Sequence, residues 1–111
     1  MKNFEEYKNI FEEVIRCSKS ANASDAVKNY LLSLDYETVQ LVQVAMYLGD
    51  DEKELERTTN LWEKLEYEIA QNLWSSDKEL EVRHISDKCE GKLVGEALER
   101  IMNKLISKCN Q

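Results

Sequence analysis

The chain has 111 residues, of which 42% are hydrophobic and 33% are charged, and its formal net charge is −7. This length fits one domain over residues 1–111, and the composition excludes a disordered or fibrous chain. The negative charge argues against direct binding to nucleic acid or to an anionic membrane surface. The chain has no proline and three glycines, and this shortage of turn-forming residues favours an all-α fold.

The amino-terminal third predicts two amphipathic helices. Residues 3–18 carry a stripe of apolar side chains at helical spacing, formed by Phe4, Tyr7, Phe11 and Val14. Acidic residues interrupt this apolar stretch, so we expect no signal peptide. The small, polar segment 18–25 predicts a flexible loop, with Ser24 or Asp25 as the cap of a short second helix.

The most apolar part of the chain is the segment 31–49, LLSLDYETVQLVQVAMYLG, which is too short to cross a membrane. Asp35 predicts the cap of a helix over residues 36–48, and Gly49 predicts its C′ position. The only polar stripe consists of Gln40, Gln43 and Tyr47, so we expect this helix to be the buried centre of a bundle. A β-strand is the competing interpretation, because the segment is short and rich in valine.

A long helix is expected to begin at Asp50 or Asp51 and to reach Trp74. Its core-facing stripe consists of Leu55, Thr58, Trp62, Leu65, Ile69 and Leu73. The following residues, Ser75 to Asp77, predict a break.

Two further helices complete the prediction. Ser76 is expected to cap the first of them, with Glu79 as its capping-box partner and Gly91 as its end. Its weak apolar face includes Leu80 and His84, together with Val82, Ile85 and Cys89. The last helix, over residues 92–108, has a strong apolar stripe of Leu93, Val94, Ala97, Leu98, Ile101, Met102, Leu105 and Ile106. The sequence thus predicts a single-domain bundle of five or six helices.

The residues that usually carry catalysis or bind metals are few. The three cysteines, Cys17, Cys89 and Cys109, form no CxxC pair, and their odd number fits the reducing cytoplasm. His84 is the only histidine, and Glu81 and His84 have the Glu-x-x-His spacing of di-iron bundles without the second pair that such sites need. The sequence therefore predicts no catalytic residue, no metal site and no cofactor.

An acidic run, DDEKELE, covers residues 50–56. Such a cluster could bind a cation or mimic the DNA surface, but it lacks the ligand order and the glycine of a calcium loop. Negative charge at the start of a helix also interacts favourably with the helix dipole and stabilises the helix. We therefore prefer a structural role for this run.

Three aromatic residues in the second half are candidates for a binding surface, because Trp and Tyr dominate interaction hot spots. Trp62 lies in register with the core stripe, so it is expected in the core. Tyr67 and Trp74 are seven residues apart on a neighbouring stripe, and we expect these two residues to contact a partner.

By exclusion, the sequence predicts a small, acidic, cytoplasmic and non-enzymatic protein that binds a protein partner. An inhibitor, an immunity protein or an antitoxin of prokaryotic or phage origin would fit this description. One alternative is a structural subunit that self-associates, for example as a homodimer. The other is a small metal- or ligand-dependent helical enzyme that uses His84 with Glu81 or Cys89.

Three segments resemble a known family: LLSLDYETVQLVQVAMYLGD (31–50), LWEKLEYEIA (61–70) and GKLVGEALERIMNKL (91–105). Over roughly residues 31–105 they are similar to the domain-of-unknown-function 3775 family, which consists of uncharacterised small helical bacterial proteins. The resemblance implies a small helical fold, supports a helix at 36–48 and implies no known catalytic residue.

Overall fold

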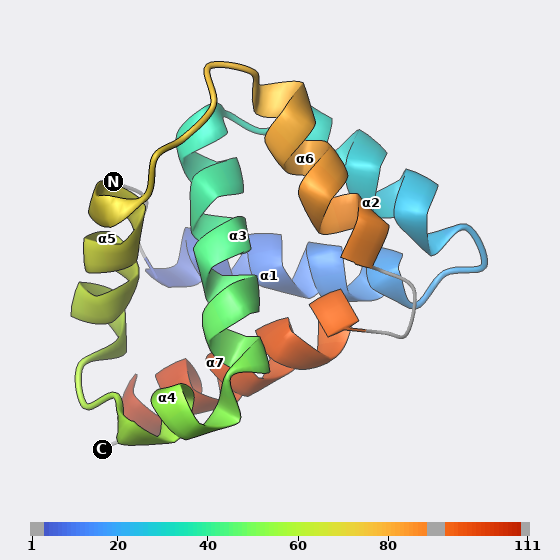
Figure 1. Ribbon diagram of the computed structural model, residues 1–111. Coiled ribbons are helices and arrows are strands. Elements are labelled where there is room, and N and C mark those ends of the chain that lie inside the picture. The colour runs from blue at the N-terminus through green and yellow to red at the C-terminus, as the bar shows by residue number, and fades with distance from the viewer. Residues whose placement is uncertain (1–3, 89–92, 110–111) are drawn as a thin grey trace.

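The computed structural model describes residues 4–88 and 93–109. These residues form seven helices and no strand (Figure 1): α1 (Phe4–Ser18), α2 (Ala23–Leu32), α3 (Tyr36–Asp50), α4 (Glu52–Arg57), α5 (Leu61–Gln71), α6 (Lys78–Ser86) and α7 (Leu93–Cys109). The predicted all-α fold is confirmed, whereas the predicted number of five or six helices is too low for the described residues. Among them, no helix combines the length and the apolar character needed to span a membrane.

Helix α3, whose sequence is nearly uninterrupted in its apolar character, contacts four other helices. It packs against α4, α5, α6 and α7, and α2 packs against both α6 and α1. Ten of the fifteen residues of α3 are buried. The alternative prediction of a β-strand in this segment is wrong. Figure 1 shows α5 on one side of α3, with α2 and α6 on the other.

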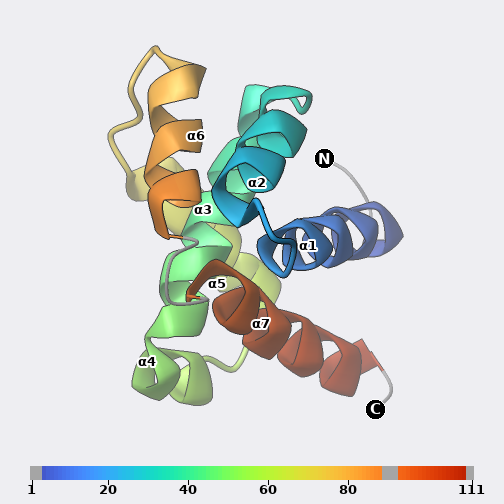
Figure 2. The ribbon, with the colours of Figure 1, turned by 90° about the vertical axis from the view of Figure 1, so that its right-hand side faces the viewer.

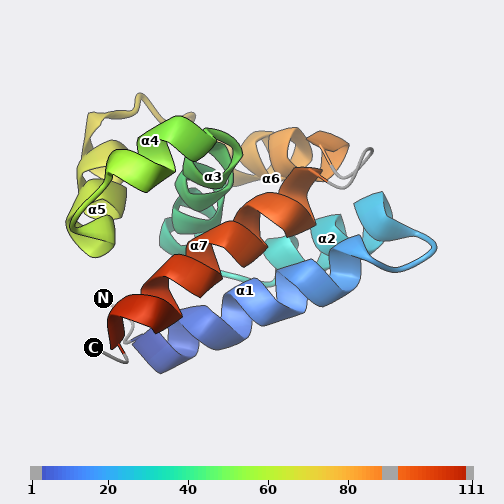
Figure 3. The ribbon, with the colours of Figure 1, turned by 90° about the horizontal axis from the view of Figure 1, so that it is seen from below.

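Helices α1 and α7 close the opposite side of the core, where they lie side by side in Figures 2 and 3. The predicted stripe of α1 is buried at Tyr7, Phe11 and Val14, while the side chain of Phe4 lies outside the described part. The predicted stripe of α7 is also buried, at Val94, Ala97, Leu98, Ile101, Met102 and Leu105. Both stripes supply the large apolar side chains that hold this helix pair together.

Helix α3 begins as predicted but does not end at Gly49. The Asp35 carboxylate accepts a hydrogen bond from the backbone N–H of Thr38 at 2.9 Å, which is the predicted cap. Gly49 lies inside the helix and faces α7, where an added Cβ atom would lie 2.7 Å from the carbonyl carbon of Ala97. Glycine at this position permits close helix packing, so the prediction of a helix terminator is wrong.

The long helix predicted from Asp51 to Trp74 is two helices. Helix α4 ends at Arg57, Thr58 has an extended backbone, and the Asn60 side chain caps α5 by accepting from the N–H of Glu63 at 3.1 Å. Two β-branched threonines followed by a good capping residue favour such a break. The apolar stripe continues at helical spacing across the break, so periodicity alone does not reveal that the helix is interrupted.

Several further boundaries differ from the prediction. Helix α5 ends at Gln71, and Leu73, expected in the core, is fully exposed in the connection to α6. Asp77 caps α6 in place of Ser76, because its carboxylate accepts from the N–H of Glu79 at 3.0 Å. Helix α6 ends at Ser86, and the predicted end at Gly91 lies outside the described residues.

The start of α2 and the apolar face of α6 also differ from the prediction. Helix α2 begins at Ala23, before the predicted caps Ser24 and Asp25, so the connection to α1 is shorter than the predicted loop 18–25. Helix α6 buries Val82 and Ile85, whereas Leu80 and His84 are exposed. The predicted apolar face is therefore confirmed at Val82 and Ile85 and wrong at Leu80 and His84.

Three cationic side chains bind backbone carbonyls at the ends of neighbouring helices. Lys78 donates to the carbonyls of Leu32, at 2.9 Å, and of Leu34, just beyond α2. Arg100 of α7 donates to the carbonyl of Gly49 at 3.0 Å and lies 3.1 Å from the Glu52 carboxylate. Lys104, also on α7, donates to the carbonyl of Leu55 in α4.

The contacts of Arg100 and Lys104 fix α4 relative to α3 and α7. The Lys104 ammonium lies near the end of α7 and binds a carbonyl of α4, so it acts beyond its own helix. Carbonyl groups at helix ends lack partners within the helix, so a cation from another helix both neutralises the dipole and holds two elements together.

Candidate functional site

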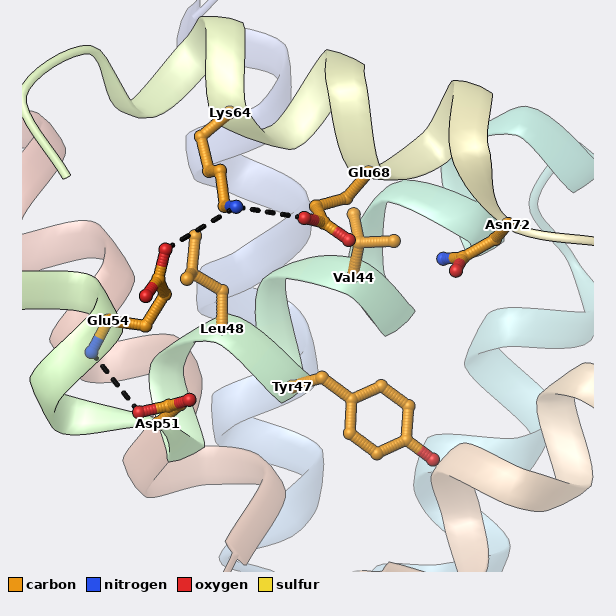
Figure 4. Close-up of a pocket in the computed structure, with 8 residues that line it drawn as sticks. All are labelled: Val44, Tyr47, Leu48, Asp51, Glu54, Lys64, Glu68 and Asn72. Carbon is orange, nitrogen blue, oxygen red and sulfur yellow. Dashed lines mark hydrogen bonds and ion pairs between the residues drawn. The ribbon is translucent and has the colours of Figure 1, made fainter.

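A groove lies between α3 and α5, next to the point where α4 begins (Figure 4). Its volume is about 290 Å³. We call it the α3–α5 groove and define it by its lining residues, Val44, Tyr47, Leu48, Asp51, Glu54, Lys64, Glu68 and Asn72. It is therefore assembled from four consecutive elements of the chain: α3, the Asp51 cap, α4 and α5 with its carboxyl-terminal end.

The floor of the groove is apolar and one wall is aromatic. Val44 and Leu48 lie one turn apart on α3 and are both buried. Tyr47 stands beside them with 46% of its surface exposed, and the ammonium nitrogen of Lys88 lies 5.5 Å from the centre of its ring. A cation at this distance from an aromatic ring is attracted by the ring quadrupole.

The opposite wall is charged. The Lys64 ammonium lies 2.9 Å from the Glu68 carboxylate and 3.5 Å from the Glu54 carboxylate (Figure 4). The hydrogen bond to Glu68 is the main reason that the pKa of Lys64 is raised above its usual value. Lys64 is therefore fully charged at neutral pH, and one ammonium is shared between two carboxylates.

Asp51 contributes a third carboxylate to the groove. It accepts a hydrogen bond from the backbone N–H of Glu54 at 3.1 Å and thereby caps α4. Within the described part of the chain, Asp51 forms no ion pair. The Glu54 carboxylate also lies 3.0 Å from the Arg57 guanidinium. Among the described residues, Asp51 is therefore the one lining carboxylate without a cationic partner, and it favours a positively charged ligand.

A second hollow adjoins the groove at the connection between α4 and α5. It is lined by Glu54, Arg57, Thr58, Thr59, Asn60, Glu63, Lys64 and Tyr67, and we call it the α4–α5 corner. It shares Glu54 and Lys64 with the α3–α5 groove. Tyr67 is 56% exposed, and the Lys64 nitrogen lies 5.9 Å from the centre of its ring. Two exposed tyrosines therefore border adjoining hollows.

The structure separates the two residues that the sequence predicted to act together. Tyr67 is exposed at the α4–α5 corner, whereas Trp74 is partly buried against the core. The indole N–H of Trp74 donates to the carbonyl of Ile69 at 2.8 Å. Trp62 also packs against the core, with its ring 5.2 Å from that of Tyr7.

Tyr47 was not predicted as a site residue, although its position carried a signal. It is the one aromatic residue in the polar stripe of a helix that is otherwise mostly apolar. The acidic run has the predicted structural roles at Asp51, which caps α4, and at Glu52, which pairs with Arg100. Asp51 and Glu54 also line the groove, and the sequence pattern alone does not indicate this position.

The residues considered for catalysis or metal binding do not form a cluster. His84 is half exposed, and its Nδ1 atom lies 3.6 Å from the buried Glu81 carboxylate. Residues 4–88 and 93–106 hold no group of three His, Cys, Asp or Glu side chains suited to a metal ion. Cys17 is buried, which raises the pKa of its thiol, while the side chains of Cys89 and Cys109 lie outside the described part.

Gln43, one turn before Tyr47, is buried, and its Oε1 atom accepts no hydrogen bond from any described residue. A buried acceptor without a donor destabilises a fold by about 1–3 kcal/mol. We expect Gln43→Met, which keeps the length of the side chain, to raise the free energy of unfolding by about 1 kcal/mol. Urea denaturation followed by circular dichroism measures this change, and a lower midpoint than that of the wild type would contradict it.

Comparison with known proteins gave no relative: no family model matches the chain, and no curated protein and no solved structure matches it. We therefore infer the function from the groove and the two exposed tyrosines.

Proposed function

We propose that this protein is non-enzymatic and acts by binding a protein partner, as inhibitors, immunity proteins and antitoxins do. The contact surface in this proposal is the face that contains the α3–α5 groove and the α4–α5 corner. The observation that carries the proposal is that Tyr47 and Tyr67, each about half exposed, border two hollows that share Glu54 and Lys64.

The composition of this face supports a protein partner. Tyrosine is enriched in interaction hot spots because its large ring buries much surface and its hydroxyl group remains able to hydrogen bond. The apolar floor at Val44 and Leu48, surrounded by charged residues, has the pattern of an interface core with a polar rim. The net charge of −7 favours a partner with a basic surface.

The size of the groove also supports a macromolecule over a free small molecule. Pockets that enclose a drug-sized ligand have volumes of about 300–1,000 Å³. The α3–α5 groove, at about 290 Å³, lies at the lower limit of this range and is open to one side chain of a larger partner. We place this interaction in the cytoplasm of a prokaryotic or phage-infected cell, where cysteine thiols such as that of Cys17 would remain reduced.

The test is affinity capture from a nuclease-treated extract of the host, with mass spectrometry to identify and quantify the bound protein. The tagged wild type is compared with Tyr67→Ala, Tyr47→Ala and Asn29→Ala. Asn29 is the control because it is exposed on α2, which lies across α3 from α5 in Figure 1. We expect the wild type and Asn29→Ala to recover the same partner, and each tyrosine variant to recover about ten-fold less.

Circular dichroism of each variant separates loss of binding from loss of the fold. Equal recovery of a partner by all four proteins would show that the tyrosine face is not the interface. Recovery of the tagged protein alone, or of a second copy of the same chain, would contradict a heterologous protein partner.

A further inference from the structure

We infer that the α3–α5 groove binds an arginine side chain presented by a basic segment of the partner. This inference rests on the proposed function and specifies the chemistry of the contact. It combines three separate features of the groove, namely an unneutralised carboxylate, an aromatic ring whose face attracts cations, and an apolar floor between them.

The carboxylates set the charge of the ligand. Lys64 neutralises part of the charge of Glu68, at 2.9 Å, and Glu54 is paired with both Lys64, at 3.5 Å, and Arg57, at 3.0 Å. Asp51 uses its carboxylate to cap α4, but no described residue supplies it with a positive charge. A carboxylate that accepts only one neutral N–H retains lone pairs for a guanidinium group, which donates several N–H bonds in one plane.

The tyrosine ring favours the same charge. Lys88 lies over the Tyr47 ring at 5.5 Å, and Lys64 lies over the Tyr67 ring at 5.9 Å. Both exposed tyrosines of this face therefore already have a cation near their rings. Lys88 lies two residues beyond the end of α6, on a long and flexible side chain, so an incoming cation can replace its ammonium group on the Tyr47 ring.

The floor and the far end of the groove distinguish arginine from a smaller cation. The methylene groups of a bound side chain would cover the apolar surface of Val44 and Leu48. Figure 4 shows the amide of Asn72 and the ring of Tyr47 on the two sides of the opening. A guanidinium group can stack on the ring and bind a carboxylate at the same time, whereas a lysine ammonium is a more strongly hydrated point charge.

The experiment is an NMR titration of the full-length ¹⁵N-labelled protein with acetyl-Gly-Arg-Gly amide. Matched peptides carry lysine or citrulline in place of arginine, and citrulline keeps the shape of arginine without its charge. We expect saturable shifts of the backbone amides of Tyr47, Leu48 and Asn72 with the arginine peptide. The affinity should be about three-fold lower with lysine and at least about ten-fold lower with citrulline.

Two variants with the same charge change locate the site. Asp51→Asn removes the carboxylate but keeps the cap of α4, because asparagine caps helices as well as aspartate does. This substitution should lower the affinity for the arginine peptide about five-fold. Asp25→Asn on α2 removes an exposed charge away from the groove and should leave the affinity unchanged.

Tyr47→Leu keeps an apolar side chain and removes the aromatic ring. It should lower the affinity for the arginine peptide about three-fold. Equal affinities for the arginine and citrulline peptides would overturn the inference, as would equal effects of Asp51→Asn and Asp25→Asn. Shifts spread over all acidic surfaces would also overturn it, because they would indicate general counterion attraction. In each of these cases the capture experiment with the tyrosine variants still tests the proposed function separately.

Discussion

Replacing Gly49 by alanine is expected to lower the free energy of unfolding by about 3 kcal/mol. Gly49 is buried in α3 where this helix crosses α7, and a Cβ atom at this position would overlap the backbone carbonyl group of Ala97. Backbone atoms cannot rotate away, so α3 and α7 would have to separate. Separation would also disturb the hydrogen bond between the Arg100 guanidinium and the carbonyl of Gly49.

Gly95 in α7 is the matched control for this prediction. A Cβ atom there would meet the side-chain oxygen of Ser18, and the next contact is the Ser18 Cβ atom at 3.5 Å. Removing that oxygen should relieve the clash, so the double variant Gly95→Ala, Ser18→Ala should be at least as stable as Ser18→Ala alone. Alanine even gains up to about 1 kcal/mol over glycine inside a helix.

Urea denaturation followed by circular dichroism measures all of these variants. If Gly49→Ala were as stable as the wild type, the helices α3 and α7 could not approach as closely as described.

The helical fold was predictable because apolar side chains repeat at helical spacing in a chain without proline. The stripes of α1 and α7 are buried as expected, and the Asp35 cap is where the sequence placed it. Each of these features depends on residues within one turn or one helix. Local spacing is sufficient for such features.

Features that depend on contacts between helices were not predictable. Gly49 was assigned to a helix end because glycine is common there, whereas the backbone of Ala97, forty-eight positions away in the sequence, determines its role. The break at Thr58 to Asn60 was missed because the apolar stripe continues on both sides of it. The Asn60 side chain caps a new helix at this point, although the apolar side chains keep their helical spacing across the break.

In the candidate site, too, local sequence predicts some features, whereas others depend on how the helices are arranged. Tyr67 was predicted from its residue type and is exposed, while Trp74 was predicted by the same reasoning and packs against the core. The distinction depends on where α5 ends, since Trp74 lies beyond Gln71 and turns back to the carbonyl of Ile69. The α3–α5 groove joins residues 44 to 72, and only the angle between helices brings them together.

Replacing Phe11 by alanine is expected to lower the free energy of unfolding by about 4 kcal/mol. Phe11 is completely buried and is the largest fully buried side chain among the described residues. It lies in the stripe that α1 presents to α7, so its removal leaves a cavity that two packed helices cannot fill. A domain of this size is stabilised by only about 5–15 kcal/mol, so this loss is a large fraction of the total.

Two controls define this effect. Phe11→Leu retains most of the apolar volume and should lower the free energy of unfolding by about 1–1.5 kcal/mol. Glu12→Ala changes an exposed residue and should leave the free energy of unfolding nearly unchanged. Circular dichroism reports on all helices. Tryptophan fluorescence reports on Trp62, whose ring lies against Tyr7 of α1, and on Trp74, which packs against the core. Because α1 shares one core with the other helices, both signals should shift to the same lower urea concentration in Phe11→Ala. Two different midpoints for the two signals would instead show that the helices do not unfold together, and the described residues would not form one cooperative unit.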